Sequence, residues 1–246
     1  MQPMKVEIWS DVVCPWCYLG KHRFEQALAQ FEHRDQVEII WRSYQLDPNA
    51  PRASGETLNE MLAKKYGMSV KQAAANHDRL TALGAEAGLE YHFERARPGN
   101  TFDAHRLIHL AASKGLQAEV KERLMRAYFT DGAAIGDSET LVQIVADVGI
   151  DADEARAVLA GDAYADGVRA DERRARALGI HGVPFFALDE TYGVSGAQPA
   201  EVFLNVLEHA WAESHPLIKI GGDAEDSGVC EDDSCAIQDI EAERLG

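Results

Sequence analysis

Two cysteines separated by two residues, Cys14 and Cys17, have the clearest chemical potential in this chain. They follow a short strand pattern at residues 5–9 and begin an amphipathic helix pattern that runs to Phe31. Cys14 therefore falls near the N-cap of the helix. Pro15 takes the first helical position, where its missing N–H costs nothing.

The helix start gives the two thiols different chemistry. Unpaired N–H groups and the positive end of the helix dipole favour a thiolate on Cys14, while Cys17 lies one turn further in. We expect Cys14 to attack a disulfide and Cys17 to resolve the mixed disulfide. The alternatives are half of a zinc site or two inert core cysteines. Zinc pairs usually lie on hairpin knuckles, so the strand-to-helix position favours redox chemistry.

Composition limits the classes of function. The chain has 246 residues, 46% hydrophobic content and a net charge of −17, which disfavours binding to a nucleic acid backbone. No apolar run reaches the length of a membrane span, and residues 1–4 lead into the first strand without a secretory signal. We therefore expect a cytoplasmic protein, in which cysteines serve catalysis, redox sensing or metal binding.

The order of predicted elements is strand–helix–strand, then helices, then strand–strand–helix. Val6 and Ile8 should share one face of the first strand, and residues 36–44 should form a second, parallel strand. Seven helical segments follow, at residues 58–66, 69–88, 103–114, 117–129, 138–148, 151–160 and 162–178. A hairpin at 184–188 and 192–195 and a helix at 199–211 complete the pattern. The mixed charges of 169–176 are interpreted as a solvated helix face.

These patterns predict an α/β fold in three parts. Residues 1–53 and 180–212 would form the sheet domain, and residues 54–179 an all-helical insertion. Residues 213–246 form an acidic tail with ten acidic residues against Lys219 and Arg244. The tail carries the second cysteine pair, Cys230 and Cys235.

Four sequence blocks, in this order, resemble the DsbA-like thioredoxin superfamily. They are Ser10–Gly20 around the cysteines, Asn100–Leu107, Gly182–Phe186 and Ser195–Pro199. The closest resemblance is to the FrnE-type branch, which is related to 2-hydroxychromene-2-carboxylate isomerases, and it covers roughly residues 4–212. It implies a thioredoxin fold (βαβ–ββα) with a helical insertion.

The resemblance also implies a substrate-aligning loop. Val183–Pro184 would be a cis peptide that faces the dithiol and leaves the Val183 backbone free to pair with an extended substrate. In the alternative reading, Pro184 only begins an edge strand in trans. Trp16, between the cysteines, would tune the redox potential and meet substrate, or simply cover the helix start.

The second block, Asn100–Leu107, contains two further residues to which the resemblance gives a role. By resemblance, Asn100 and His105 face the active-site groove and contact substrate. Taken alone, Asn100 is an ordinary helix-start residue, and a single histidine is more often structural.

The resemblance assigns the tail pair, Cys230 and Cys235, as a second redox pair that exchanges electrons with the first. The flanking acids disfavour a thiolate there, which suits a shuttle better than a primary nucleophile. One alternative is that the pair forms an inert local clip. Another is that all four cysteines bind one zinc or softer metal ion.

The function expected from the sequence is a thiol–disulfide oxidoreductase/isomerase that acts on protein disulfides. It needs no cofactor beyond its dithiols and no metal, with glutathione as a candidate reductant and the electron donor unidentified. Exposed faces of the insertion offer a homodimer surface. One alternative is a glutathione-dependent isomerase or transferase acting on a small aromatic compound, although such relatives commonly keep a single serine or cysteine. The other is a metal-responsive thiol sensor or chaperone.

Overall fold

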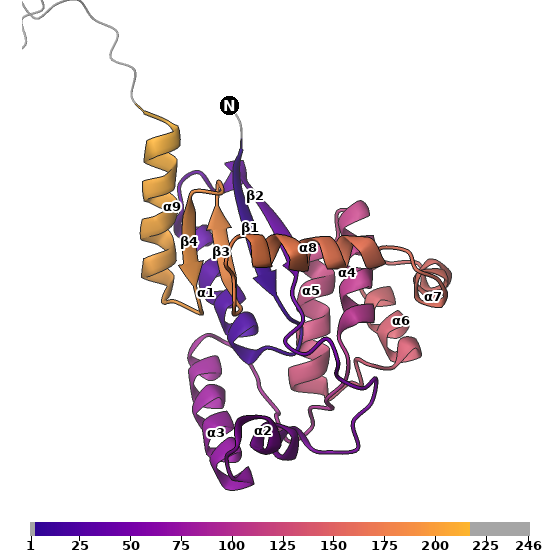
Figure 1. Ribbon diagram of the computed structural model, residues 1–246. Coiled ribbons are helices and arrows are strands. Elements are labelled where there is room, and N and C mark those ends of the chain that lie inside the picture. Colours follow the sequence, from indigo (N-terminus) through magenta and orange to yellow (C-terminus); the bar gives the residue numbers. More distant parts are fainter. Residues whose placement is uncertain (1–2, 217–246) are drawn as a thin grey trace, which may run out of the picture.

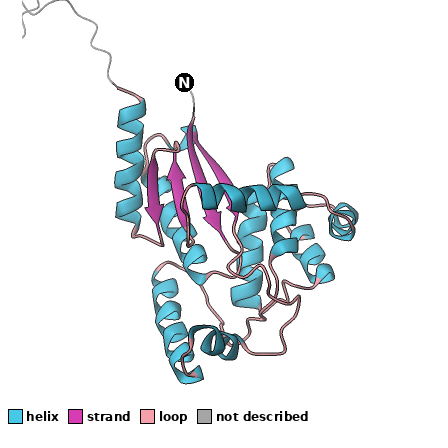
Figure 2. Cartoon of the chain, viewed as in Figure 1, coloured by secondary structure: helices cyan, strands magenta, loops and turns pink. Residues whose placement is uncertain are grey.

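A computed structural model describes residues 3–216, so Cys230 and Cys235 lie outside the described residues. A four-stranded sheet has the order β2-β1-β3-β4, with bounds β1 Met4–Ser10, β2 Val37–Ser43, β3 Phe185–Leu188 and β4 Tyr192–Ser195. β1 and β2 are parallel, whereas β3 runs antiparallel to β1 and β4 (Figures 1 and 2). This sheet confirms the predicted thioredoxin-type order.

One face of the sheet packs against α1 (Pro15–Gln30) and α9 (Ala200–Ser214), which lie beside each other. Val6 and Ile8 belong to this core together with Phe24, Phe186 and Phe203, which confirms the predicted face of β1. The three phenylalanine rings pack with centroids 4.5–5.7 Å apart. Aromatic contacts of this kind fix the direction of α1, and with it the position of Cys14.

The other face of the sheet is covered by α8 (Ala165–Ala177), which crosses it in Figure 1. Trp9 is fully buried there against Ala175, and its indole N–H donates to the carbonyl oxygen of Asp171 at 3.1 Å. The predicted insertion segment therefore includes a helix that forms part of the sheet's core.

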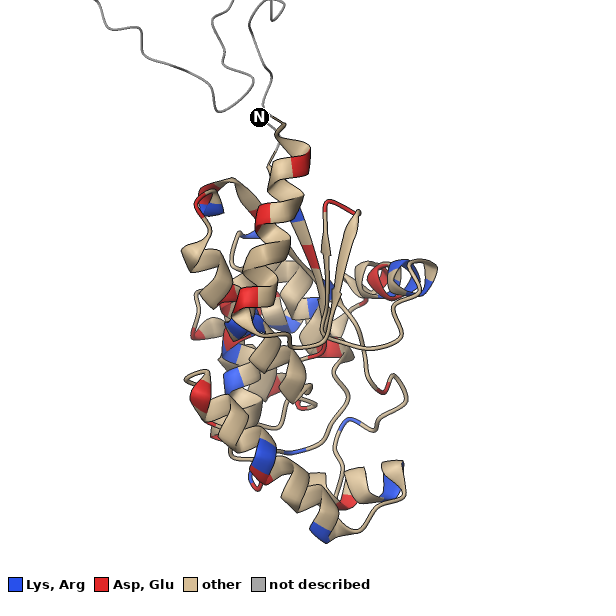
Figure 3. Cartoon of the chain, turned by 90° about the vertical axis from the view of Figure 1, so that its left-hand side faces the viewer, with Lys and Arg blue, Asp and Glu red and all other residues tan. Residues whose placement is uncertain are grey.

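The prediction that residues 169–176 form a solvated face is wrong for Asp171, whereas Arg174 is partly exposed and pairs with a buried carboxylate. Acidic and basic residues are interspersed along the helices in Figure 3, but Asp171 is buried and its carboxylate lies 3.1 Å from Arg42. Glu7, also buried, accepts from Arg42 at 2.6 Å and from Arg174 at 2.7 Å. Desolvation raises the pKa of Glu7, but the two arginines outweigh it and leave the pKa below its usual value. α8 can lie on polar strand residues because their charges are paired.

The remaining helices are α2 Leu58–Tyr66, α3 Val70–Glu86, α4 Phe102–Ser113, α5 Gln117–Arg126, α6 Ser138–Ala146 and α7 Ala152–Ala160. The predicted capping box at Ser69 and Gln72 is present, and Asp151 caps α7. The predicted helix at 117–129 instead leaves α geometry after Arg126 and continues as a π-helical turn, Ala127–Asp131. Among residues 3–216, no helix is both long and apolar enough to cross a membrane.

The loop between β2 and α2 is held close to the insertion at Gly136. A Cβ atom there would lie 1.7 Å from the carbonyl oxygen of Arg52, so only glycine permits this approach. The loop in turn forms one wall of the site described next.

Candidate active site

Cys14 is the N-cap residue of α1, as predicted. Its backbone is extended, with φ −92° and ψ 111°, and Pro15 occupies the first helical position. The carbonyl oxygen of Cys14 accepts from the N–H groups of Cys17 at 3.0 Å and Tyr18 at 3.2 Å. No side chain caps the helix start and the first turn holds no acidic residue. The positive end of the helix dipole is therefore not offset near the Cys14 sulfur.

The two thiols differ in access. Both cysteines are unpaired; Cys14 is 4% exposed and lines a cavity, whereas Cys17 is 1% exposed and does not. Burial raises the pKa of the Cys17 thiol well above its ordinary value, and its hydrogen bond with Cys14 adds to the effect. Cys17 is therefore held protonated behind the sulfur that faces the cavity, which fits an attacking role for Cys14 and a resolving role for Cys17.

The loop before β3 meets the dithiol. The Val183–Pro184 peptide is cis, as expected, and the Cys14 thiol donates to the carbonyl oxygen of Val183 at 3.7 Å. Gly20 on α1 permits this packing, because a Cβ there would lie 2.9 Å from Pro184 Cγ. The structure thus brings Cys14, Val183 and Pro184 together from positions far apart in sequence.

A cavity of about 610 Å³ opens beside Cys14. Its walls come from the loop after β2, from α2 and α3, and from Phe93 and Val183. Trp16 lines the cavity and is 44% exposed, so it can contact both an occupant and solvent. The volume lies within the roughly 300–1,000 Å³ of typical ligand sites.

Three buried polar residues form a cluster beside the dithiol: Asp11, which also lines the cavity, His105 and Lys121. Asp11 accepts from the N–H of Leu46 at 2.8 Å and lies 3.2 Å from His105 Nε2. Desolvation raises the pKa of Asp11, but these hydrogen bonds outweigh it and hold the pKa below its usual value. Burial lowers the pKa of His105 and leaves the imidazole neutral, so Nε2–H donates to the Asp11 carboxylate.

Lys121 on α5 is 1% exposed and its Nζ donates to the carbonyl oxygen of Ser10 at 3.3 Å. Desolvation lowers the pKa of Lys121 to about 8, although nearby Cys17 and Asp11 oppose that shift. A buried ammonium near the dithiol favours negative charge on sulfur.

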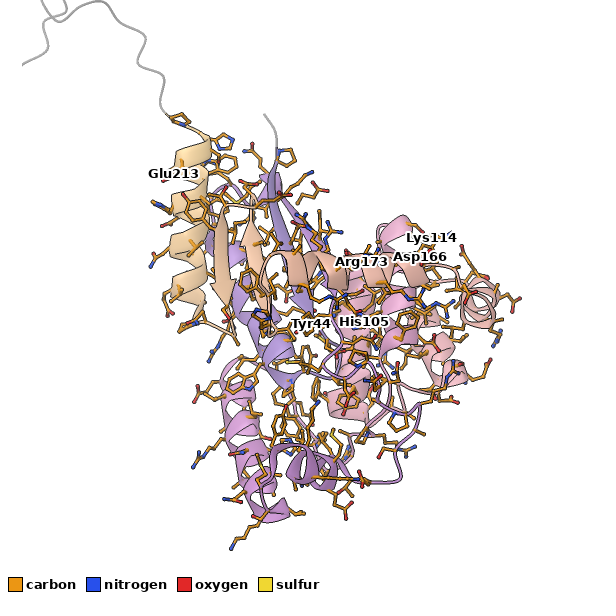
Figure 4. All side chains as sticks on the ribbon, viewed as in Figure 1. Tyr44, His105, Lys114, Asp166, Arg173 and Glu213 are labelled. Carbon is orange, nitrogen blue, oxygen red and sulfur yellow. The ribbon has the colours of Figure 1, made fainter. Side chains whose placement is uncertain are left out.

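The structure does not place His105 in the cavity, contrary to the expectation that it meets substrate. His105, labelled in Figure 4, is fully buried on α4, and its polar contact is Asp11 in the segment after β1. The side-chain amide of Asn100 is also engaged within the protein: its Nδ2 donates to the carbonyl oxygens of Pro48 and Ala50 at 3.1 and 3.0 Å. It holds the cavity wall in place, in line with the structural reading of this residue. Direct contact of Asn100 with substrate stays a prediction.

The model of the DSBA-like thioredoxin domain family matches residues 5–208. The chain belongs to this DsbA-like family. A crystal structure of a probable DsbA oxidoreductase from Streptomyces coelicolor is 51% identical, covers 95% of this chain and 99% of that one, and has a TM-score of 0.83.

Two more distant structures share the DsbA-like fold. The cytosolic disulfide reductase DsbM from Pseudomonas aeruginosa with GSH is 18% identical, with a TM-score of 0.60 over 84% of this chain and 98% of that one. A 2-hydroxychromene-2-carboxylate isomerase is 13% identical, with a TM-score of 0.64 over 85% of this chain and 97% of that one. At these identities the likeness concerns the fold alone.

Asp11 and Lys121 of this DsbA-like site were not predicted from the sequence. Asp11 lies between a strand and the cysteine motif, where an acidic residue reads as part of an ordinary turn. Lys121 offers no signal, because lysine in a helical segment is normally solvated. Within residues 3–216, no three histidine, cysteine or acidic side chains group as ligands for a metal. The four-cysteine metal site also requires Cys230 and Cys235, which lie beyond the described range.

Proposed function

We propose that this DsbA-like protein is a thiol–disulfide oxidoreductase/isomerase of the FrnE type that acts on protein disulfides. The observation that carries the proposal is the position of Cys14, at an uncapped helix start and facing a cavity, with Cys17 buried behind it. A reactive thiol is thereby paired with a protected resolving thiol.

In the reducing direction, the Cys14 thiolate attacks one sulfur of a substrate disulfide. An S–S bond forms between Cys14 and that sulfur, and the other substrate sulfur leaves as a thiolate that takes up a proton. Cys17 then loses its proton and attacks Cys14 Sγ, which releases the second substrate sulfur. The substrate gains two electrons, and Cys14 and Cys17 become a disulfide.

Isomerisation uses the first step only. A thiol of the same substrate attacks the mixed disulfide, and Cys14 leaves as a thiolate, so that no net electrons are exchanged. The substrate chain extends past Val183, whose carbonyl oxygen already lies 3.7 Å from Cys14 Sγ.

A reductant must convert the Cys14–Cys17 disulfide back to two thiols before the next turnover. We propose that Cys230 and Cys235 reduce the Cys14–Cys17 disulfide and become oxidised, with glutathione as the alternative thiol donor. A cytoplasmic location, where such thiols are abundant, suits this cycle. Replacing both tail cysteines by serine should leave the first turnover of reduced protein unchanged and slow later turnovers. Equal rates throughout would exclude the shuttle.

The main test measures insulin reduction and refolding of scrambled ribonuclease. Cys14→Ser should abolish both activities, and Cys17→Ser should accumulate a mixed disulfide on Cys14. A Cys14→Ser protein with full activity in both assays would reject the proposal.

A glutathione-dependent isomerase acting on a small aromatic compound is a second candidate, since the cavity of about 610 Å³ has mainly apolar side chains around it. Glutathione-dependent isomerisation of such a compound that survives Cys17→Ser, together with absent insulin reduction, would favour this function. A homodimer, also expected from the sequence, is tested by sedimentation.

A further inference from the structure

Tyr128 is 1% exposed, but its hydroxyl makes no hydrogen bond to any of residues 3–216. The hydroxyl of a buried tyrosine normally has a hydrogen-bond partner. The oxygen is not fully enclosed by protein atoms either, so it opens onto the cavity beside Cys14, which Tyr128 lines. The phenol thus offers a hydrogen bond to a group that enters this cavity.

The π-helical turn that carries Tyr128 is anchored on both sides. The carbonyl oxygen of Phe129 accepts from the N–H of His92 at 2.7 Å. The hydroxyl of Thr130 donates to the carbonyl oxygen of Glu90, also at 2.7 Å. The rings of Tyr128 and Phe129 meet edge to face, with centroids 4.9 Å apart. A π-helical turn is rare and often lies at a functional site. The phenol is therefore held in one place before a substrate arrives.

A second hydroxyl lines the same cavity, at the start of α4. Thr101 is the N-cap residue of α4 and is 3% exposed, yet its side chain accepts no capping hydrogen bond. The Oδ1 of Asn100 takes that role and accepts from the N–H of Phe102 at 2.9 Å. An N-cap threonine normally bonds to its own helix. Because Thr101 Oγ1 does not, and is not fully enclosed, it is left for a group in the cavity.

The charges beside the phenol indicate what kind of group it serves. Burial raises the pKa of Tyr128 well above its ordinary value, and the negative charge of Asp11 adds to the shift, so the phenol remains a donor. Asp11 also lines the cavity, where its carboxylate disfavours a ligand that is permanently anionic. A group that becomes negative only during the reaction fits a fixed neutral donor better.

The leaving sulfur of a substrate disulfide is such a group. Cys14 is 4% exposed and lines the cavity, so a disulfide reaches its sulfur through that space. Thiolate attack on a disulfide is in line, which places the leaving sulfur on the far side of the attacked sulfur from Cys14. Negative charge therefore develops within the cavity into which the Tyr128 hydroxyl opens.

We propose that Tyr128 is a catalytic residue of the exchange at Cys14, and that its Oη–H donates a hydrogen bond to the departing substrate sulfur, with Thr101 Oγ1–H as a second donor. The inference rests on the proposed function and adds a residue to its first step. An S–S bond forms at Cys14 as the substrate S–S bond breaks, and the electron pair of the broken bond goes to the leaving sulfur. Tyr128 keeps its proton, and the released thiolate takes one from water.

The test uses the full chain with Cys17→Ser, so that the mixed disulfide on Cys14 accumulates. Mass spectrometry after acid quench identifies the half that Cys14 retains. Two disulfides share N-acetylcysteine methylamide and differ in the other half, which is 2-mercaptoethanol or 4-nitrothiophenol. An aliphatic thiolate concentrates its charge on sulfur, whereas the aromatic thiolate spreads the charge over its ring. The rate with the aliphatic reagent should therefore depend far more on a hydrogen bond to the leaving sulfur.

Tyr128→Phe keeps the ring and removes the hydroxyl. It should slow the aliphatic reagent about tenfold, the factor that one hydrogen bond to a developing charge contributes, and the aromatic reagent less than about twofold. Thr101→Val should change the two rates in the same direction. Alkylation of Cys14 by iodoacetamide, in which no sulfur leaves, should keep its rate in both variants.

The matched control is Tyr18→Phe. Tyr18 is also buried and stacks on Phe129 with centroids 5.9 Å apart, but its hydroxyl donates to Glu122 at 2.6 Å and it does not line the cavity. A change in packing alone should alter the rates of both disulfides and of alkylation by one common factor.

The outcomes separate this inference from the proposed function. If neither disulfide reacts with Cys14, the proposed function fails. If both react, but Tyr128→Phe slows them by the same factor, slows alkylation as well or behaves like Tyr18→Phe, the function stands and the inference is overturned. A selective loss that is confined to Thr101→Val also overturns the role of Tyr128.

Discussion

Replacing the buried Lys121 by methionine should stabilise the protein at neutral pH. Lys121 is 1% exposed and its pKa falls from 10.5 to about 8, chiefly through desolvation. Burying a lysine in such a site makes folding less favourable at every pH at which the side chain is charged in both the folded and the unfolded protein. The shift of about 2.5 pKa units corresponds to about 3 kcal/mol at pH 7, at 1.36 kcal/mol per unit. Methionine fills a similar volume without the charge.

The stabilisation by Lys121→Met should decrease as the pH rises. Because the folded pKa lies below the unfolded one, the cost of Lys121 is present in full below about pH 8 and is relieved as the pH rises towards 10.5. Lys121→Met should therefore gain about 3 kcal/mol at pH 7 but only about 1.4 kcal/mol at pH 9.5. Urea unfolding of the reduced protein at both pH values measures the difference.

A matched control is available in Lys21, which is also buried but lies 2.6 Å from Glu122. Lys21→Met removes the nearest cation from that carboxylate, which keeps its hydrogen bond from Tyr18 Oη at 2.6 Å, and it should destabilise the protein at pH 7 instead of stabilising it. Lys121→Met should also slow resolution by Cys17, because the ammonium lowers the pKa of that thiol. A Lys121→Met protein that is less stable than the wild type at pH 7, or whose gain is the same at pH 9.5, would refute the reasoning.

Three further changes test other parts of the fold. Gly136→Ala should lower the free energy of unfolding in urea by more than about 2 kcal/mol, because its Cβ would overlap a carbonyl oxygen. The control, Gly55→Ala, has nothing within 4 Å of its Cβ and should change that free energy by less than about 0.5 kcal/mol. Equal losses would contradict the packing. Glu7→Gln should lower the free energy of unfolding by about 2 kcal/mol at pH 7, and this loss should shrink as the pH falls through the lowered pKa of Glu7 in the folded protein. A loss that stays constant with pH would exclude the ion pairs as its source. Gly20→Ala should reduce the rate of insulin reduction several-fold, because its Cβ meets Pro184; unchanged activity would show that this loop can shift without loss.

The reacting residues were predictable because the fold imposes local rules on them. A strand followed by Cys-Pro-x-Cys sets Cys14 at a helix start and Cys17 one turn further in, and both positions are confirmed. The order of strands and helices was equally readable from periodicity and caps. The contact between Cys14 and Val183, by contrast, spans 169 residues and came only from the family resemblance.

The polar interior was not predictable, because burial of a charged residue depends on partners distant in sequence. Asp171 reads as a surface residue until Arg42, 129 positions away, is placed beside it. His105 was expected in the groove, yet its partner is Asp11, 94 positions earlier. The burial of His77 on α3 was not predictable either. Its ring stacks on Phe93, and its buried Nδ1 has no hydrogen-bond partner among the described residues.

Both sulfurs belong to the same hydrophobic cluster as Phe129 and Leu107 of the helical segment. Tyr91 Oη reinforces this junction by donating to the carbonyl oxygen of Pro15 at 2.8 Å. Making or breaking the Cys14–Cys17 bond therefore alters the packing between the start of α1 and the helical segment. Because α1 also packs on the sheet, the sheet and the helices should melt in one transition whose midpoint moves with the redox state of the dithiol.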